Sequence, residues 1–240
     1  MSAIFSDVLS CFIIFVSNFV SMAVKLVVFD LDGTLLNTIG DLAAACNHVL
    51  VANGYPTHEL EQYKIFVGSG VRRLVERALP DDVPETEVER MRDEFVEYYA
   101  AHIDGHTVPY DGMRGILHSL HEASVKVAVL SNKFHAGTCR LVSEYFSDME
   151  FFAVYGQRPD VPLKPDTYML CKLMEDAGAK PSETVFVGDS GIDMDTANAA
   201  GVLSVGVTWG FRSRDELVSH SARVLVDSPG QLEQLLMNYL

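Results

Sequence analysis

Residues 25–36, with the sequence KLVVFDLDGTLL, constrain the fold of this chain more than any other stretch. Their first half is a short, continuously apolar, β-favouring run, which is typical of a strand buried on both faces of a parallel sheet. The run stops at Asp30, and Asp32 follows two positions later. Because residues i and i+2 of an extended segment point the same way, both carboxylates can face one small space beyond the carboxyl end of the strand. Open α/β sheets bind ligands there, so the pattern predicts a site.

Two further apolar runs end in polar residues in the same way. One, VFVG, ends at Asp189, and Asp193 follows four positions later. Another, VKVAVL, is followed by Ser131 and Asn132. A DxDG tetrapeptide alone is as compatible with a solvated turn as with a site. Two strands that each end in carboxylates favour one shared site.

A lone lysine, Lys164, precedes a proline in a predicted loop before a helical stretch. With it, four short motifs follow one another along the chain: FDLDGTL, VLSNK, LKP and GDSGIDM. In this order and spacing they resemble the motifs of the haloacid dehalogenase superfamily of phosphohydrolases, and the resemblance runs from about residue 25 to the C-terminus. It implies Mg²⁺-dependent chemistry on a small phosphorylated substrate.

The predicted elements indicate an α/β fold: a doubly wound parallel sheet, Rossmann-like and of the haloacid dehalogenase type, with an inserted all-helical domain. Residues 37–108 have helical periodicity without a strand signal, whereas strands and helices alternate over residues 109–240. We therefore expect a catalytic core of residues 24–36 and 109–240, and a helical cap of residues 37–108. The insertion resembles the cap of the phosphoglycolate phosphatase branch, which closes over the active site.

The resemblance assigns catalytic roles to residues of the motifs. It implies that Asp30 is the nucleophile that forms an aspartyl-phosphate intermediate, and that Asp32 protonates the leaving oxygen and then activates water. Ser131 can hydrogen-bond the transferring phosphoryl group, and Lys164 would cancel its charge. A plain Ser-Asn turn and an exposed loop lysine are the alternatives for these two. Lys133, which follows Ser131 and Asn132 in the VLSNK motif, could face either substrate or solvent.

Carboxylates of the motifs suit a magnesium ion, because Mg²⁺ prefers hard oxygen ligands. The expected ligands are Asp30, Asp189 and Asp193, with Asp32 as a further candidate. Without a cation, carboxylates crowded together in this way could not all stay ionised.

A second set of residues is expected to bind substrate or shape its site. Gly68, Ser69 and Gly70 precede a predicted helix whose free N–H groups can bind an anion, and Arg72 could hold the carboxylate of a small phospho-acid. A plain glycine turn with a solvated arginine is the alternative. The complete set of expected substrate-binding residues is Gly33, Thr34, Asn132, Gly68, Ser69, Gly70 and Arg72.

The predicted function is therefore a Mg²⁺-dependent phosphohydrolase for a small phosphorylated metabolite, similar to phosphoglycolate phosphatases. A phosphomutase of the same superfamily is the nearer alternative, and a catalytically idle binding module is the other. The family's usual acidic-Ser pair after DGTL is Asn37-Thr38 here, which loosens the subfamily assignment. A dehalogenase is disfavoured, because phosphoryl transfer needs the acid Asp32 and cleavage of a carbon–halogen bond does not.

Charge and cysteine content bear on partners and compartment. The formal net charge of -15 argues against a nucleic-acid partner, which would need a basic surface. The four cysteines are isolated, with no metal-like spacing, as expected of thiols in a reducing compartment. We expect a cytoplasmic monomer or homodimer.

Residues 1–23 form an apolar N-terminal extension, and residues 8–24 carry no charge. Because Met22 would be an ordinary start for a member of this superfamily, we favour a dispensable or mis-assigned extension. A secretory signal or membrane anchor, and an apolar helix packed on the domain, are the alternatives. No stable membrane association is expected unless this segment is an anchor.

Overall fold

A computed structural model describes residues 23–102 and 105–239 of the chain. The predicted extension of residues 1–23 lies outside these residues, apart from its last position. Within them, no helix is both long enough and apolar enough to cross a membrane.

Six parallel strands form the central sheet, in the order β5-β4-β1-β6-β7-β8. They are β1 (Leu26–Phe29), β4 (Lys126–Phe134), β5 (Ala153–Gln157), β6 (Thr184–Gly188), β7 (Leu203–Val207) and β8 (Val224–Val226). β1 lies in the middle and pairs with β4 on one side and β6 on the other. All residues of β1 and β6 are buried, as their continuous apolar runs predict. The sheet confirms the predicted fold class.

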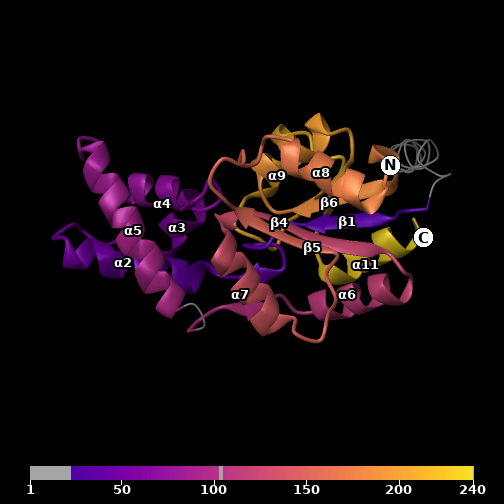
Figure 1. The fold of residues 1–240 in the computed structure, drawn as a ribbon, viewed down its shortest axis with the longest axis horizontal. Helices are drawn as coiled ribbons and strands as arrows, with labels where there is room; N and C mark the ends of the chain where they lie inside the picture. The colour runs from indigo at the N-terminus through magenta and orange to yellow at the C-terminus, as the bar shows by residue number, and fades with distance from the viewer. Residues whose placement is uncertain (1–22, 103–104, 240) are drawn as a thin grey trace, which may run out of the picture.

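Helices cover both faces of the sheet, as Figure 1 shows. One face carries α8 (Tyr168–Ala177) and α9 (Gly191–Ala199), and the other carries α6 (Met113–Glu122), α7 (His135–Tyr145) and α11 (Pro229–Met237). Two short helical elements complete this part of the fold: a 3-10 turn at Pro181–Glu183 and α10 (Arg214–Ser219).

The core has two layers, because successive residues of β1 point to opposite faces of the sheet. Val28 packs with Leu173 of α8, while Phe29 belongs to the cluster that includes Leu117 of α6 and Leu141 of α7. All five side chains are fully buried. The two layers hold β1 firmly, and with it the loop that follows.

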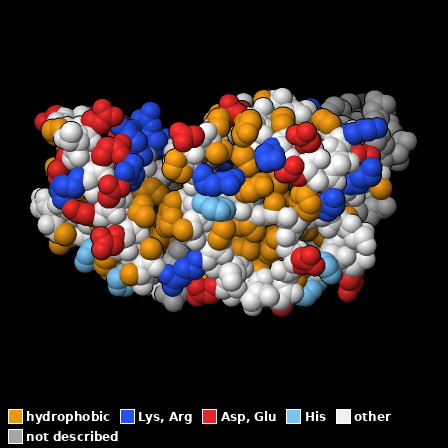
Figure 2. Space-filling view, in the orientation of Figure 1, with side chains coloured by type: hydrophobic (Ala, Val, Ile, Leu, Met, Phe, Trp, Pro, Cys, Tyr) orange, Lys and Arg blue, Asp and Glu red, His pale blue; other side chains and the backbone are white. Residues whose placement is uncertain are grey.

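Four helices form a group beyond one end of the sheet (Figure 1), and we call this group the cap. They are α2 (Ile39–Ala52), α3 (Leu60–Phe66), α4 (Val71–Ala78) and α5 (Glu85–Ala101). Their buried faces contain the large aromatic side chains of Tyr63, Phe95 and Tyr99. Apolar side chains are also visible in Figure 2 where the cap meets the core.

Two linkers connect the cap to the core, and a short antiparallel ladder joins them: β2 (Leu36–Asn37) and β3 (Val108–Pro109). Beside it, both carboxylate oxygens of Asp41 accept hydrogen bonds from the second linker, from the backbone N–H groups of His106 and Thr107 and from their side chains. We propose that the boundary between core and cap lies at this ladder, close to the expected limits of the cap, residues 37 and 108.

Candidate active site

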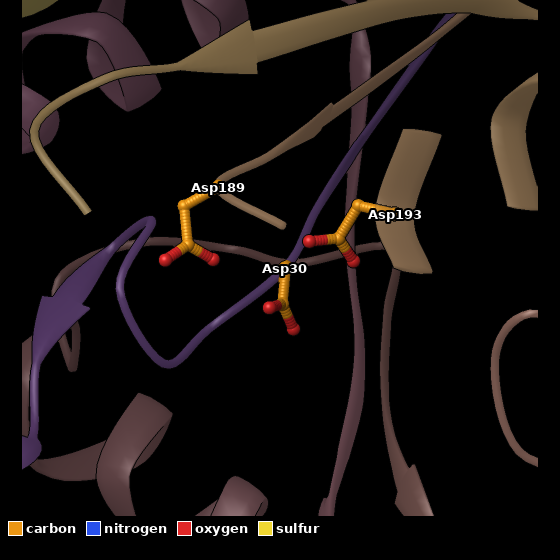
Figure 3. A group of neighbouring side chains, drawn as sticks. All are labelled: Asp30, Asp189 and Asp193. Carbon is orange, nitrogen blue, oxygen red and sulfur yellow. The ribbon is translucent and has the colours of Figure 1, made fainter. Parts of the chain in front are cut away.

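Three buried carboxylates meet at the carboxyl end of the central strands (Figure 3). Asp30 follows β1, Asp189 follows β6, and Asp193 lies in the first turn of α9. Each offers one oxygen, and these oxygens lie within 4.8 Å of one another. The strand order explains the meeting, because β1 and β6 are neighbours and their ends reach the same edge of the sheet.

Close backbone packing holds Asp189 against the loop after β1. Gly33 has a φ of 86°, and a Cβ at this position would lie 2.2 Å from Asp189 Oδ2. A side chain there is therefore excluded by contact as well as by backbone conformation. The backbone N–H of Phe211 donates to the same oxygen over 2.7 Å. Gly33 thus shapes the site through its close approach to Asp189.

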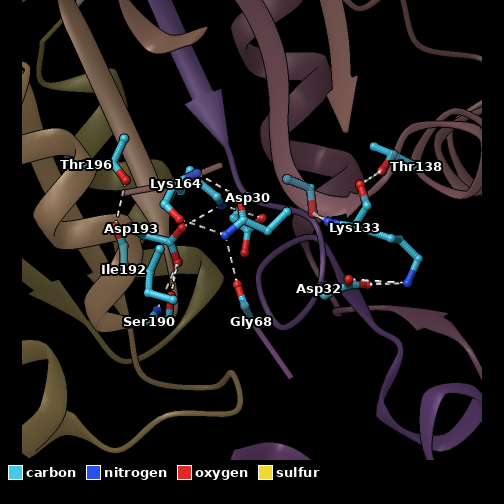
Figure 4. Close-up of polar contacts among 12 residues, drawn as sticks. Asp30, Asp32, Gly68, Lys133, Thr138, Lys164, Ser190, Ile192, Asp193 and Thr196 are labelled. Carbon is cyan, nitrogen blue, oxygen red and sulfur yellow. Dashed lines mark hydrogen bonds and ion pairs between the residues drawn. The ribbon is translucent and has the colours of Figure 1, made fainter. Parts of the chain in front are cut away.

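Lys164 lies between two of the carboxylates. Its Nζ is 2.8 Å from Asp30 Oδ1 and 2.7 Å from Asp193 Oδ1 (Figure 4). Burial alone would lower the pKa of Lys164, but the two carboxylates raise it, so the ammonium form is retained. The amide of Asn132 fixes this loop: its Oδ1 accepts from the backbone N–H of Lys164, and its Nδ2 donates to the backbone oxygens of Lys164 and Gly68. Asn132 is a positioning residue in this arrangement.

The carboxylates still carry more negative charge than one lysine can balance. Burial raises the pKa of Asp30 to about 7, although Lys164 opposes the shift. Burial and the charges of Asp193 and Asp30 raise the pKa of Asp189 well above its ordinary value. Among the described residues, Lys164 is the cation beside Asp30 and Asp193, and the buried Asp189 carboxylate receives a single backbone N–H. Three buried carboxylates that share one lysine leave negative charge uncompensated, and such a set of oxygen ligands fits Mg²⁺.

Asp32 lies apart from this group. Both of its carboxylate oxygens contact Lys133 Nζ, at 3.1 and 3.3 Å, and Oδ1 also accepts a hydrogen bond of 2.7 Å from the hydroxyl of Thr38. The acidic cluster is formed by Asp30, Asp189 and Asp193. The geometry therefore does not support the expectation that the Asp32 carboxylate is a fourth metal ligand, and it leaves this group available for proton transfer.

Lys133 is buried and paired, so the solvent-facing alternative for this residue is wrong. Its Nζ also lies 4.5 Å from the ring centroid of Tyr99, which belongs to α5 of the cap. Burial alone would lower the pKa of Lys133, but Asp32 and Tyr99 raise it. No sequence motif marks the contact between Tyr99 of the cap and Lys133, so the sequence does not predict it.

A pocket lies over these residues, between cap and core, and it holds about 580 Å³ of empty space, part of which is open to solvent. Asp30, Asp32 and Ser131 line it from the core, whereas Leu42 and Phe95 line it from the cap. The backbone N–H of Lys133 donates to Ser131 Oγ over 3.2 Å, so the hydroxyl proton of Ser131 is available to a ligand.

The expected substrate-binding residues divide into two groups. Gly68, Gly70 and Asn132 line the pocket. Thr34 is fully buried, and its backbone oxygen accepts from the indole N–H of Trp209, so it supports the loop. The hydroxyl of Ser69 accepts a hydrogen bond from Arg77.

Arg72 points away from the pocket. Its guanidinium pairs with three glutamates of the cap, Glu76, Glu85 and Glu89. Basic and acidic side chains are interspersed on this part of the surface, as Figure 2 shows. This arrangement does not support the expectation that Arg72 binds substrate.

Residues 27–207 match the model of the haloacid dehalogenase-like hydrolase family, and the match includes all four motifs. The chain therefore belongs to the haloacid dehalogenase-like hydrolase family. This confirms the resemblance seen in the four motifs.

Curated relatives cover most of the chain. It is 34% identical to the phosphoglycolate phosphatase of Pseudomonas putida over 210 residues. This aligned region covers 85% of this chain and 76% of that protein. It is 33% identical to the phosphoglycolate phosphatase of Mesorhizobium japonicum over 196 residues. That region covers 80% of this chain and 86% of that protein.

Solved structures share the architecture. A crystal structure from Lactobacillus delbrueckii, of a candidate phosphoglycolate phosphatase, superposes with a TM-score of 0.84 at 33% identity and covers 90% of this chain and 99% of that one. The β-phosphoglucomutase of Clostridium difficile gives a TM-score of 0.73 at 20% identity, over 90% of this chain and 97% of that one. The second likeness is one of fold alone.

Proposed function

We propose that the protein is a Mg²⁺-dependent phosphatase that hydrolyses a small phosphorylated acid, with phosphoglycolate as the first candidate. The observation that supports this most is the contact of Lys164 with both Asp30 and Asp193 beside the pocket. A phosphate monoester is a dianion, so a carboxylate can attack it only where cations neutralise the site. The names of the curated relatives support the choice of phosphoglycolate.

Asp30, Asp189 and Asp193 would hold the magnesium ion. When bound, the ion would neutralise the crowded carboxylates and polarise the phosphoryl oxygens. Lys164 adds a fixed positive charge at Asp30 and favours its ionised form, which is the form that can attack.

The chemical steps use Asp30 and Asp32. An oxygen of Asp30 attacks phosphorus, the bond from phosphorus to the substrate oxygen breaks, and the carboxylic acid of Asp32 gives its proton to that oxygen. The Asp32 carboxylate then takes a proton from water, which attacks phosphorus and displaces the Asp30 carboxylate. The Ser131 hydroxyl donates a hydrogen bond to a phosphoryl oxygen in both steps and keeps its proton.

The test is the release of inorganic phosphate from phosphoglycolate, ethyl phosphate and p-nitrophenyl phosphate in the presence of Mg²⁺, with EDTA as the control. We expect release that requires Mg²⁺ and is fastest with phosphoglycolate. Undiminished release in excess EDTA would overturn the metal assignment. Conversion of a sugar phosphate to its isomer without free phosphate would identify a phosphomutase, and no turnover of any substrate would identify a binding module.

A further inference from the structure

Arg212 brings a cation to the pocket from a loop that lies outside the four motifs. It follows Phe211, whose backbone N–H donates to Asp189, so its backbone is tied to the acidic cluster. Both residues line the pocket together with Asp30. The Arg212 side chain is only 13% exposed.

The guanidinium of Arg212 is directed at the cap. Its Nη2 donates to the backbone oxygens of Val67, over 2.7 Å, and Ile65, over 3.1 Å. A Cβ at Gly68 would lie 3.6 Å from the same nitrogen. Arg212 thus occupies the place beside the Gly68–Gly70 loop that the sequence suggested for Arg72.

Arg212 differs from the two lysines of the site in how its charge is balanced. Lys133 and Lys164 each have a carboxylate oxygen within 3.1 Å. Among the described residues, the carboxylate that forms an ion pair with Arg212 is Glu216, at 3.5 Å, and its Oε1 also accepts from the N–H of Gly191. The charge of Arg212 also lowers the pKa of Asp189, but burial and the other carboxylates outweigh this effect. The two short bonds of Arg212 go to neutral carbonyls. A guanidinium has five N–H donors, so Arg212 retains both charge and donors for an anion.

We propose that Arg212 is a specificity-determining residue that binds the carboxylate of the substrate while Asp30 and Lys164 engage the phosphate. This inference rests on the proposed phosphatase function. Asp30 and Arg212 line the same pocket, so the carboxylate and the phosphate of the substrate are separated by few atoms. Because Nη2 also donates to Val67 and Ile65, the cap backbone holds the guanidinium of Arg212 in this position.

The test compares two substrates that differ in one group, phosphoglycolate and 2-hydroxyethyl phosphate, in which a neutral CH₂OH replaces the carboxylate. We measure the ratio of their kcat/KM values in wild type, Arg212→Gln and Arg212→Lys. Arg212→Gln should lower the ratio about 10- to 100-fold, mainly through KM for phosphoglycolate, as expected for one charged hydrogen-bonded contact. Arg212→Lys retains a positive charge, so its ratio should lie between those of wild type and Arg212→Gln.

Matched controls distinguish Arg212 from nearby arginines. Arg214→Gln removes an exposed guanidinium two positions away that pairs with Asp227, and Arg72→Gln removes the arginine that pairs with cap glutamates. Both should keep the wild-type ratio. Thermal melts of each variant report whether it is folded.

Several outcomes would overturn the inference. An equal loss on both substrates in Arg212→Gln and Arg212→Lys would mean that Arg212 only holds the cap. A lower ratio in Arg72→Gln would assign the carboxylate to Arg72. A wild-type enzyme that hydrolyses both substrates without preference would refute carboxylate recognition and leave the phosphatase function intact, whereas a wild-type protein that hydrolyses neither would refute the function itself.

Discussion

Lys133 Nζ lies 3.1 Å from Asp32 Oδ1, and the two side chains are only 2% and 11% exposed. Lys133 belongs to the end of β4, Asp32 to the loop after β1, and the ring of Tyr99 in the cap covers the ammonium group. The Thr38 hydroxyl, at the start of α2, donates to the same carboxylate. The proposed acid–base group is therefore held by the core, a linker and the cap together.

This arrangement predicts that Lys133 acts through Asp32. Lys133→Ala leaves a buried carboxylate without its counter-charge, and we expect kcat to fall about 10- to 100-fold. Asp32→Asn alone should cost about 10²- to 10⁴-fold, the range for a general acid–base group. In the Asp32→Asn background, Lys133→Ala should cost much less than it does in wild type. A double-mutant cycle on kcat measures the coupling.

Lys172→Ala is the control for this cycle, because Lys172 forms an exposed ion pair on α8 with Asp176. It should leave kcat unchanged. Additive losses in the cycle would show that Lys133 and Asp32 act independently and would contradict this account.

The raised pKa of Asp30 predicts how the metal-free protein responds to pH. An unfolded aspartate has a pKa of about 3.9, whereas Asp30 has a folded pKa of about 7 because it is buried. The folded form therefore binds the proton more tightly, so the contribution of Asp30 to stability is fully present below pH about 4 and is lost as pH rises to about 7. A shift of this size corresponds to at most about 4 kcal/mol. Urea unfolding in EDTA should show the fall in wild type and a flatter curve in Asp30→Asn.

Magnesium should reverse this loss. An ion that binds only the folded protein stabilises it, and it binds the ionised carboxylates best, so the gain in melting temperature should grow as pH rises from 5 to 7.5. Asp189→Ala removes one proposed ligand and should shift the Mg²⁺ midpoint to a much higher concentration. A wild-type melting temperature that does not respond to millimolar Mg²⁺ at any pH would contradict the metal site.

The linkers provide a separate stability prediction. The Asp41 carboxylate is buried and accepts hydrogen bonds from the backbone and side chains of His106 and Thr107. Asp41→Ala leaves these donors without their acceptor, and we expect a loss of roughly 2–4 kcal/mol in the free energy of unfolding. Asp93→Ala, at an exposed carboxylate, should cost less than about 0.5 kcal/mol. Equal effects would show that Asp41 does not hold the linkers together.

Much of this structure is predictable because local sequence and tertiary structure agree. The apolar run before Asp30 matches β1, and the helical periodicity after residue 37 matches the cap helices. The strand after Val125 is longer than predicted: β4 continues through Ser131 and Asn132 to Phe134. The polar side chains predict an earlier end to the strand, but both are buried. The cap and the Lys164 loop supply the hydrogen-bond partners of Asn132.

The partners of the charged residues are less predictable, since they depend on tertiary packing. Arg72 follows a glycine loop as an anion-binding residue would, yet nearby glutamates of α4 and α5 take its guanidinium. Arg212 has no motif of its own and reaches the cap across 145 positions of the chain, at Val67. The first pairing depends on how the cap helices pack together and the second on how the cap packs on the core, and periodicity reports neither.

The central claim, that Asp30 is a covalent nucleophile, is tested most directly by Asp30→Asn. The measurement is the rate of phosphate release from p-nitrophenyl phosphate and phosphoglycolate at saturating Mg²⁺, with a melting curve to show that the variant is folded. The account predicts turnover by wild type and none above background by the folded variant, because an amide cannot form the aspartyl-phosphate intermediate. A folded Asp30→Asn protein that releases phosphate at close to the wild-type rate would contradict it.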